Sequence, residues 1–222
     1  MARIVLLRHA HSVANEKNLL AGRTPGIALS KTGRDQALQL VNRLGAITFD
    51  EIAVSPMQRC RETIDPWLTS SNGKSRVVTD DSISEVDYGS WSGKSLASLR
   101  RKSQWKVVQD FPSQMVFPEG ESLLEMQGRA LSCFYRLNAV KGKGPRLLVS
   151  HGDVIKSIVA HCLGMHLDQF QRLVIEPASI TIIDTDNGMS RLVRFNDAKG
   201  FLASNSSSNQ SAIGGSTGNQ SK

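Results

Sequence analysis

Three short apolar runs stand out along the chain, and polar residues follow each of them. The runs are Ala2–Leu7, Glu51–Ser55 and Arg146–Ser150. Their apolar positions are largely continuous rather than alternating, which is typical of central parallel strands that are covered on both faces. The pattern therefore predicts three buried strands in a parallel sheet.

Apolar residues recur at helical spacing after these runs. A helix is expected to begin at the N-cap Ser30. A second, over 57–68, is expected to end or kink near Pro66. A third opens with a Ser-x-x-Glu capping box formed by Ser122 and Glu125, and a fourth follows His151.

The segment 179–195 is expected to form a β-hairpin that turns at Asn187–Gly188 and adds an antiparallel edge to the sheet. Strands that alternate with helices predict a three-layer α/β/α sandwich with a mostly parallel central sheet. A chain of 222 residues with 40% hydrophobic residues is expected to form one such domain, over 1–197. The remaining residues, 198–222, are rich in Ser, Asn and Gly and are expected to be a disordered tail.

The net charge and the cysteine content indicate the kind of ligand and the cellular setting of the protein. The net charge of +7 favours an anionic ligand of some kind. The three cysteines, Cys60, Cys133 and Cys162, match neither a metal-ligand spacing nor a disulfide framework, so a reducing, cytoplasmic setting is expected. No apolar run is long enough to span a membrane or to serve as a signal-peptide core.

Side chains that could take part in catalysis follow the ends of the predicted strands. Arg8 and His9 follow the first strand, Arg59 follows the second, and His151 follows the third. Ligands of open α/β sheets bind beyond the carboxyl ends of the strands, so these four side chains are expected to converge in one crevice. Guanidinium groups match phosphate oxygens bidentately. Glu85 is a candidate for the carboxyl group that these segments lack.

Nucleic-acid binding is an alternative function, because the stretch 100–106 is basic and contains Trp105. A solvated helix face accounts for this stretch better, because no recognised nucleic-acid motif accompanies it, and we expect no nucleic-acid partner.

The order of these segments resembles the histidine phosphatase superfamily, in its phosphoglycerate-mutase-like branch. The matching stretches, in chain order, are LLRHAHSVAN, GRTPGIALSKTGRDQA, VSPMQRCRET, EVDYGSWSGKS, FPEGESLLEMQGRA and LLVSHGDVIKSIVAHCLG. The resemblance covers roughly residues 1–196 and implies a phosphomonoester hydrolase that acts through a phosphohistidine intermediate on a small anionic phosphorylated substrate.

The resemblance assigns a role to each candidate catalytic residue. His9 is expected to be the nucleophile, since a neutral imidazole with an ordinary pKa of about 6.5 attacks phosphorus well near pH 7. Arg8, Arg59 and a protonated His151 are expected to hold the phosphoryl oxygens. Glu85 is expected to protonate the leaving alkoxide and then to activate water, although Asp80, Asp81 and Asp87 lie close enough in sequence to compete for this role.

A second set of residues is expected to bind substrate, and no metal or other cofactor is expected, because the arginines supply the positive charge. The expected substrate-binding residues are Ser12, Asn15, Gly22, Arg23 and Gly152.

Two departures from the family pattern bear on the reaction. His11 stands where the family often has glutamate, which makes the pocket more cationic and leaves the role of His11 open. Val86 and Asp87 follow Glu85, whereas mutases of this branch typically carry an arginine directly after that glutamate. A phosphatase is therefore favoured over a phosphoglycerate-type phosphomutase. A non-enzymatic phospholigand-binding module is disfavoured, because both histidines, both arginines and the acid are retained.

Overall fold

In residues 1–71 and 75–202, which this computed structural model describes, six strands form one sheet in the order β3-β2-β4-β1-β5-β6. Strands β1 to β4 are parallel, and β5 is antiparallel to its neighbours β1 and β6. The strands are β1 (Ala2–Arg8), β2 (Glu51–Val54), β3 (Arg76–Thr79), β4 (Arg146–Ser150), β5 (Ile180–Asp186) and β6 (Met189–Asp197).

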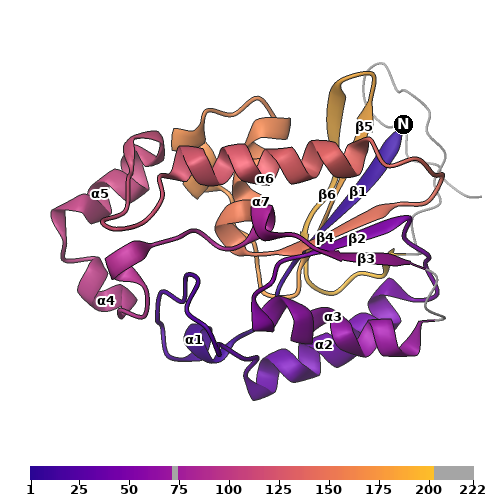
Figure 1. The fold of residues 1–222 in the computed structure, drawn as a ribbon, viewed down its shortest axis with the longest axis horizontal. Helices are drawn as coiled ribbons and strands as arrows, with labels where there is room; N and C mark the ends of the chain where they lie inside the picture. The colour runs from indigo at the N-terminus through magenta and orange to yellow at the C-terminus, as the bar shows by residue number, and fades with distance from the viewer. Residues whose placement is uncertain (72–74, 203–222) are drawn as a thin grey trace, which may run out of the picture.

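Helices cover both faces of the sheet. Helices α2 and α3 lie against one face, and α6 and α7 lie against the other (Figure 1). The α-helices are α1 (Val13–Glu16), α2 (Lys31–Leu44), α3 (Gln58–Ser70), α4 (Leu96–Leu99), α5 (Ser103–Asp110), α6 (Leu123–Asn138) and α7 (Gly152–Cys162). The expected three-layer architecture is thus confirmed.

The burial of β1 explains its continuous apolar run. Ile4 and Leu6 enter the core beneath α6 and α7, whereas Val5 and Leu7 enter the core beneath α2 and α3. All four side chains are completely buried. Both faces of the strand are covered along Ile4–Leu7, where no side chain reaches water, so the apolar residues are continuous there.

The predicted helix starts are confirmed. The Ser30 hydroxyl accepts a hydrogen bond from the Gly33 N–H (3.1 Å), and Ser122 and Glu125 form the reciprocal capping box. Of the two outcomes expected near Pro66, an end or a kink, the end is wrong, because α3 continues through Pro66 to Ser70. Trp67 is buried just beyond the proline, and such packing of an apolar helix face supplies most helical stability in proteins.

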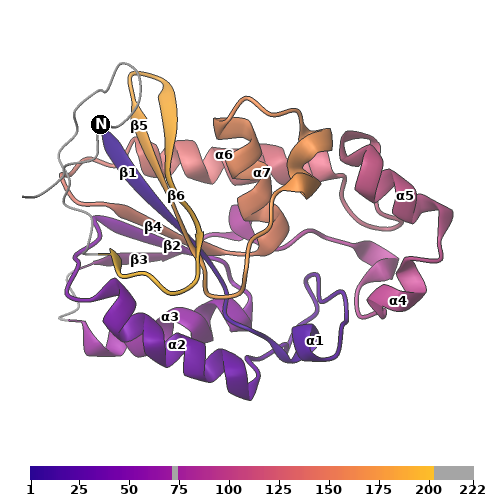
Figure 2. The same ribbon diagram turned by 180° about the vertical axis from the view of Figure 1, so that it is seen from behind.

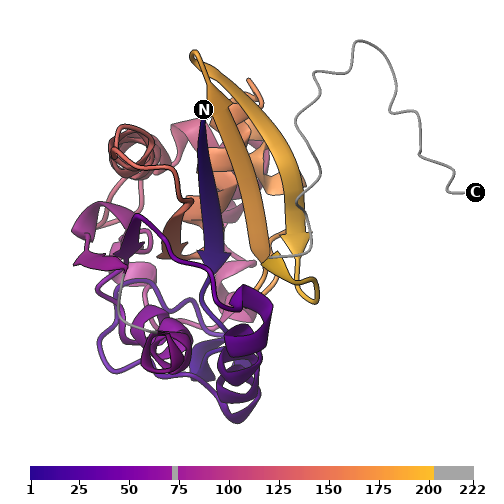
Figure 3. The same ribbon diagram turned by 90° about the vertical axis from the view of Figure 1, so that its right-hand side faces the viewer.

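The predicted hairpin is also confirmed. Asn187 and Gly188 connect β5 to β6 with φ values of 48° and 80°. Two successive positive φ values are what a type I′ turn requires, and Asn-Gly is the pair that adopts them most readily. Figure 3 shows the hairpin at one edge of the sheet, with β6 outermost.

Strand β3 was missed at the sequence level. It is only four residues long, lies at the other edge of the sheet and exposes most of its side chains. Its partner β2 is completely covered and therefore shows the apolar run that β3 lacks.

The segment that crosses from β3 to α6 forms a cap beyond the carboxyl ends of the strands. It includes α4 and α5, which project away from the sheet (Figure 2). The basic stretch 100–106 is not one helix face, because 100–102 separate the two helices. Trp105 packs against the core and stacks on Trp91, with ring centroids 6.4 Å apart, so its ring serves packing within the cap.

Residues 198–202, which the prediction places in the tail, contact the domain. Leu202 is buried in the core beneath α2 and α3, and the carbonyl of Gly200 accepts a hydrogen bond from Arg43 Nε (3.2 Å). The described chain therefore packs against the domain as far as residue 202. The rest of the predicted tail, 203–222, lies outside the described residues.

We expect Trp67→Ala to lower the free energy of unfolding by about 3–5 kcal/mol, measured by urea denaturation. Trp67 is 1% exposed, packs edge-on against Phe49 at 5.5 Å and donates its indole N–H to the Gly45 carbonyl. Leu38→Ala is the control, because Leu38 on α2 is 60% exposed and its loss should change stability by no more than about 0.5 kcal/mol. Equal effects of both substitutions would contradict this account of the core.

Candidate active site

Three neighbouring parallel strands bring the predicted residues together. Arg8 is the last residue of β1 and lies opposite Ser150 of β4, so His9 and His151 follow adjacent strand ends. Arg59 lies in the first turn of α3, which follows β2 on the other side of β4. Arg8, His9 and Arg59 line a cavity of about 190 Å³, whereas His151 is not among its lining residues and contacts Arg59 and His9 instead.

His9 is held with one ring nitrogen directed at its own backbone. Its Nδ1 lies 2.7 Å from the Ala10 carbonyl oxygen, which only accepts, so Nδ1 carries the ring proton. The Nε2 atom lies 3.3 Å from Arg59 Nε, a donor, and therefore presents a lone pair. Burial, together with the positive charges of Arg59 and Arg8, holds the pKa of His9 well below its usual 6.5. His9 is consequently a neutral imidazole with a fixed tautomer.

His151 is completely buried and lies beside His9, with ring centroids 5.2 Å apart. Its Nδ1 lies 3.1 Å from Arg59 Nη2, and its Nε2 lies 2.8 Å from the Ser55 hydroxyl. Because the arginine can only donate, Nδ1 is the acceptor and Nε2 donates to Ser55. Burial and the nearby Arg59 charge hold the pKa of His151 well below its usual value. A phosphate dianion in the cavity would oppose that effect.

Arg8 and Arg59 place two buried guanidinium groups at the cavity. Arg59 is 1% exposed and donates from Nη2 to the Gly22 carbonyl at 3.0 Å. Arg8 donates from Nη1 to the Ile175 carbonyl, and its buried Nε has no hydrogen-bond partner among the described residues. Burial lowers the pKa of Arg8 from its usual value. Positive charge with unused donors is suited to an anionic ligand.

Glu85 provides the carboxyl group expected at the cavity. Its Oε2 lies 3.7 Å from His151 Nδ1, and its Oε1 accepts from the Val86 N–H at 3.0 Å. Burial is the main cause that raises the pKa of Glu85 to about 7, and the negative charge of Asp153 raises it further. A carboxyl group with this pKa can both donate and accept a proton near neutral pH.

The competing aspartates face elsewhere. Asp80 pairs with Arg136 at 2.9 Å, Asp87 accepts from the Gly89 N–H, and Asp81 is exposed. None of the three lines the cavity, whereas Glu85 and Asp153 do.

Arg23 takes a different place from the one expected. Its Nε donates to the Glu85 backbone carbonyl (3.0 Å) and its Nη2 to Glu121 (3.0 Å), and it is not among the residues that line the cavity. Arg129 donates to the same Glu85 carbonyl and also pairs with Glu121. Both arginines thus support the backbone of the loop that carries Glu85.

Four other predicted binding residues do line the cavity: Ser12, Asn15, Gly22 and Gly152. Ser12 and Asn15 cap α1 reciprocally. Gly22 has φ of 51°, and a Cβ there would lie 2.7 Å from the Ser92 hydroxyl, so the position requires glycine. A Cβ at Gly152 would lie 3.4 Å from Arg8 Nε, an ordinary contact distance, so the Arg8 guanidinium lies directly against the start of α7.

His11 does not line the cavity. Its Nδ1 hydrogen bonds to the Ser30 hydroxyl at 2.8 Å, and its backbone carbonyl accepts from the Ser30 N–H. The ring therefore lies at the start of α2, and its positive charge, when present, reaches His9 only through space.

Sequence reasoning missed two residues that face the site. Asp153 lines the cavity and accepts a hydrogen bond from the Tyr88 hydroxyl at 2.8 Å. Ser55 supports His151 as described above. Both residues lie within the segments that resemble the family. Ser55 is the last residue of a predicted strand, and Asp153 follows the pair His151-Gly152 after another. Those positions were the available signal.

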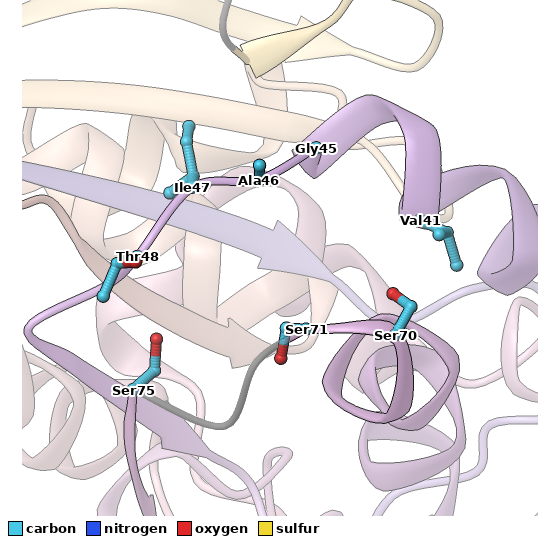
Figure 4. Close-up of a pocket in the computed structure, with 8 residues that line it drawn as sticks. All are labelled: Val41, Gly45, Ala46, Ile47, Thr48, Ser70, Ser71 and Ser75. Carbon is cyan, nitrogen blue, oxygen red and sulfur yellow. The ribbon is translucent and has the colours of Figure 1, made fainter.

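A larger cavity, of about 360 Å³, lies at the opposite end of the sheet (Figure 4). It is lined by the end of α2, the segment before β2, and Ser70, Ser71 and Ser75. None of its lining side chains is titratable, so it lacks the chemistry of the smaller cavity. Among the described residues no group of three or more His, Cys, Asp or Glu side chains is arranged to hold a metal ion, and no helix is long and apolar enough to cross a membrane.

The fold and the cavity define an α/β phosphoryl-transfer enzyme with histidines and arginines at the strand ends. Comparison with known proteins agrees: residues 4–198 match the model of the histidine phosphatase superfamily (branch 1). The chain belongs to this superfamily, and its relatives' names support a phosphoric monoester hydrolase.

Two relatives and one solved structure illustrate the similarity. The chain is 26% identical to phosphoserine phosphatase 1 of Hydrogenobacter thermophilus, over 88% of this chain and 92% of that one. It is 26% identical to "Probable 2-carboxy-D-arabinitol-1-phosphatase" of Arabidopsis thaliana, over 82% of this chain but only 38% of that longer protein. Other relatives are named phosphoglycerate mutases. The Entamoeba histolytica phosphoserine phosphatase in complex with 3-phosphoglyceric acid has the same fold, with a TM-score of 0.76, 21% identity and coverage of 89% and 98% of the two chains.

We expect Asp153→Asn to lower the pKa of Glu85 from its value of about 7, because the substitution removes a negative charge that favours the protonated form. Carboxyl titration of the labelled protein by NMR measures this change. Asp110→Asn removes the same charge outside the cavity and should leave the Glu85 pKa unchanged. An unchanged pKa in both variants would show that burial alone sets it.

Proposed function

We propose that this protein hydrolyses small phosphomonoesters and that His9 Nε2 is the atom that attacks phosphorus. The observation that carries the proposal is the state of His9, whose Nδ1 proton is bound by the Ala10 carbonyl while its Nε2 lone pair lies beside Arg59. A nucleophile that is neutral, desolvated and held in one tautomer needs only positioning of the phosphoryl group and charge stabilisation.

In the first step, the His9 Nε2–phosphorus bond forms as the ester bond breaks. Arg8, Arg59 and His151 hold the non-bridging oxygens as negative charge spreads over them. The bound dianion raises the pKa of His151, and the proton that this ring gains at Nδ1 lets it donate to the phosphoryl group. The Ser55 hydroxyl accepts from the other nitrogen throughout.

Glu85 acts as the acid in the first step and as the base in the second. As a neutral acid it protonates the leaving alkoxide, and as a carboxylate it then removes a proton from the water that attacks phospho-His9. A pKa of about 7 populates both forms near neutral pH. Protonation of the leaving group should accordingly weaken as the pH rises through about 7.

The remaining predicted residues bind the substrate or support the backbone at Glu85. Ser12 and Asn15 offer neutral hydrogen bonds at the cavity, and Gly22 and Gly152 offer backbone groups there. For Arg23 we propose a positioning role through the Glu85 backbone in place of direct substrate binding. The arginines supply the positive charge, so we expect no metal requirement. We also propose a cytoplasmic location, since Cys60, Cys133 and Cys162 are unpaired.

Hydrolysis is favoured over mutase activity because Val86 stands where mutases of this branch typically carry arginine, and its side chain is completely buried. A screen of purified protein against small phosphomonoesters, with EDTA present, tests the proposal. Phosphate release from at least one ester without isomer formation is the expected result. Isomer formation with little free phosphate would establish the mutase instead.

We expect His9→Ala to abolish turnover, leaving less than about 1% of wild-type activity, because the phosphoryl acceptor is lost. Acid-labile, base-stable labelling by a phosphorylated substrate should disappear in the same variant. Circular dichroism and thermal unfolding control for folding. Wild-type labelling of the variant would assign the phosphoryl acceptor to another residue.

Glu85→Gln should slow substrates with poor alkyl leaving groups far more than p-nitrophenyl phosphate. A nitrophenolate departs without protonation, whereas an alkoxide needs the acid, whose contribution is about 10²–10⁴-fold. The variant should also accumulate phospho-His9 from the nitrophenyl ester, because water attack loses its base. Equal losses on both substrate types, with no trapped intermediate, would make Glu85 structural; Asp87→Asn is the matched control.

A further inference from the structure

The charges that line the site cavity divide into two groups. Its two cationic side chains, Arg8 and Arg59, lie beside His9, where the phosphoryl group must bind. Its two anionic side chains are Glu85 and Asp153. The phosphoryl group thus uses the positive charge of the lining, and the anionic side chains are left to face the organic part of the substrate.

The rest of the lining adds no positive charge. Leu19, Leu20 and Leu96 contribute apolar surface, and Tyr88 contributes a hydroxyl. Arg23, which lies outside the lining, already binds the Glu85 carbonyl, Glu121 and Asp87. A carboxylate on the organic part would therefore be desolvated beside like charges without a lining cation to pair with, which is unfavourable.

Asp153 has acceptor capacity to spare. One of its oxygens accepts from the Tyr88 hydroxyl at 2.8 Å, and the other lies 3.4 Å from Lys156 Nζ. A carboxylate offers about four acceptor sites, so sites remain for a donor on the substrate. The cavity, of about 190 Å³, is suited to a small molecule.

We propose that the substrate is a phosphomonoester of a small amino alcohol, whose ammonium group binds Asp153, and that a carboxylate on the organic part is rejected. The proposal rests on the phosphatase activity proposed above. It makes Asp153 a specificity-determining residue.

Matched substrate pairs test this inference. Phosphoethanolamine and O-phosphoserine differ by one carboxylate, and kcat/KM should be at least about tenfold higher for phosphoethanolamine. Phosphoethanolamine and ethyl phosphate differ by the ammonium group, and the former should again be preferred. Asp153→Asn should reduce this second preference about tenfold, because the ammonium group loses its negatively charged partner and keeps only a weaker, neutral acceptor. Asp110→Asn, outside the cavity, should leave both ratios unchanged.

A higher kcat/KM for phosphoserine, or an ammonium preference that survives in Asp153→Asn, would overturn the inference. Turnover of p-nitrophenyl phosphate with none of the three small esters hydrolysed would also overturn it, while leaving the phosphatase activity intact. Loss of p-nitrophenyl phosphate turnover together with absence of His9 labelling would instead reject the phosphatase itself. Thermal unfolding of Asp153→Asn shows whether loss of the Tyr88 and Lys156 contacts perturbs the fold.

Discussion

The site depends on the hydrogen bond between His9 Nδ1 and the carbonyl of the next residue, Ala10. This bond places the ring proton on the nitrogen that faces away from Arg59 and so leaves the lone pair on Nε2. Burial then keeps the ring neutral, because neither the desolvated interior nor the two nearby guanidinium groups favour a second positive charge. A backbone carbonyl at the end of a fully buried strand is a rigid acceptor, which makes the orientation of the ring a property of the sheet.

Positive charge is assembled at the strand ends before any substrate arrives. Arg59 is almost completely buried and connects three elements, through His9, His151 and the Gly22 carbonyl. Burying guanidinium groups is unfavourable unless an anion or hydrogen-bond acceptors compensate for the lost hydration. The carbonyl oxygens supply part of that compensation, and a phosphoryl group supplies more. Fixed dipoles and charges of this kind need little reorganisation during the reaction.

The acid at the site is positioned from a distance. Arg129 donates to three backbone carbonyls of the loop, at Ser82, Ser84 and Glu85, and its charge is balanced by Glu121. This network attaches the loop to α6, so the position of Glu85 depends on a helix that begins 38 residues further along the chain. Asp153, in the first turn of α7, then raises the pKa of the Glu85 carboxyl group through its negative charge.

Local sequence was sufficient to predict the buried strands, the helix caps at Ser30 and Ser122 and the Asn187–Gly188 turn, because periodicity, capping and turn chemistry act over a few residues. It also predicted that His9, Arg59 and His151 follow strand ends. It left open whether the helix ends or kinks at Pro66, where the helix continues and Trp67 is packed. It missed β3, an exposed edge strand with no apolar run. Two contacts join residues that are far apart in the sequence. Arg23 binds the Glu85 carbonyl, 62 positions away, and Asp153 accepts from Tyr88, 65 positions away. Contacts over such separations arise only when the chain is packed, so tertiary structure alone decided which polar side chains line the cavity and which support it.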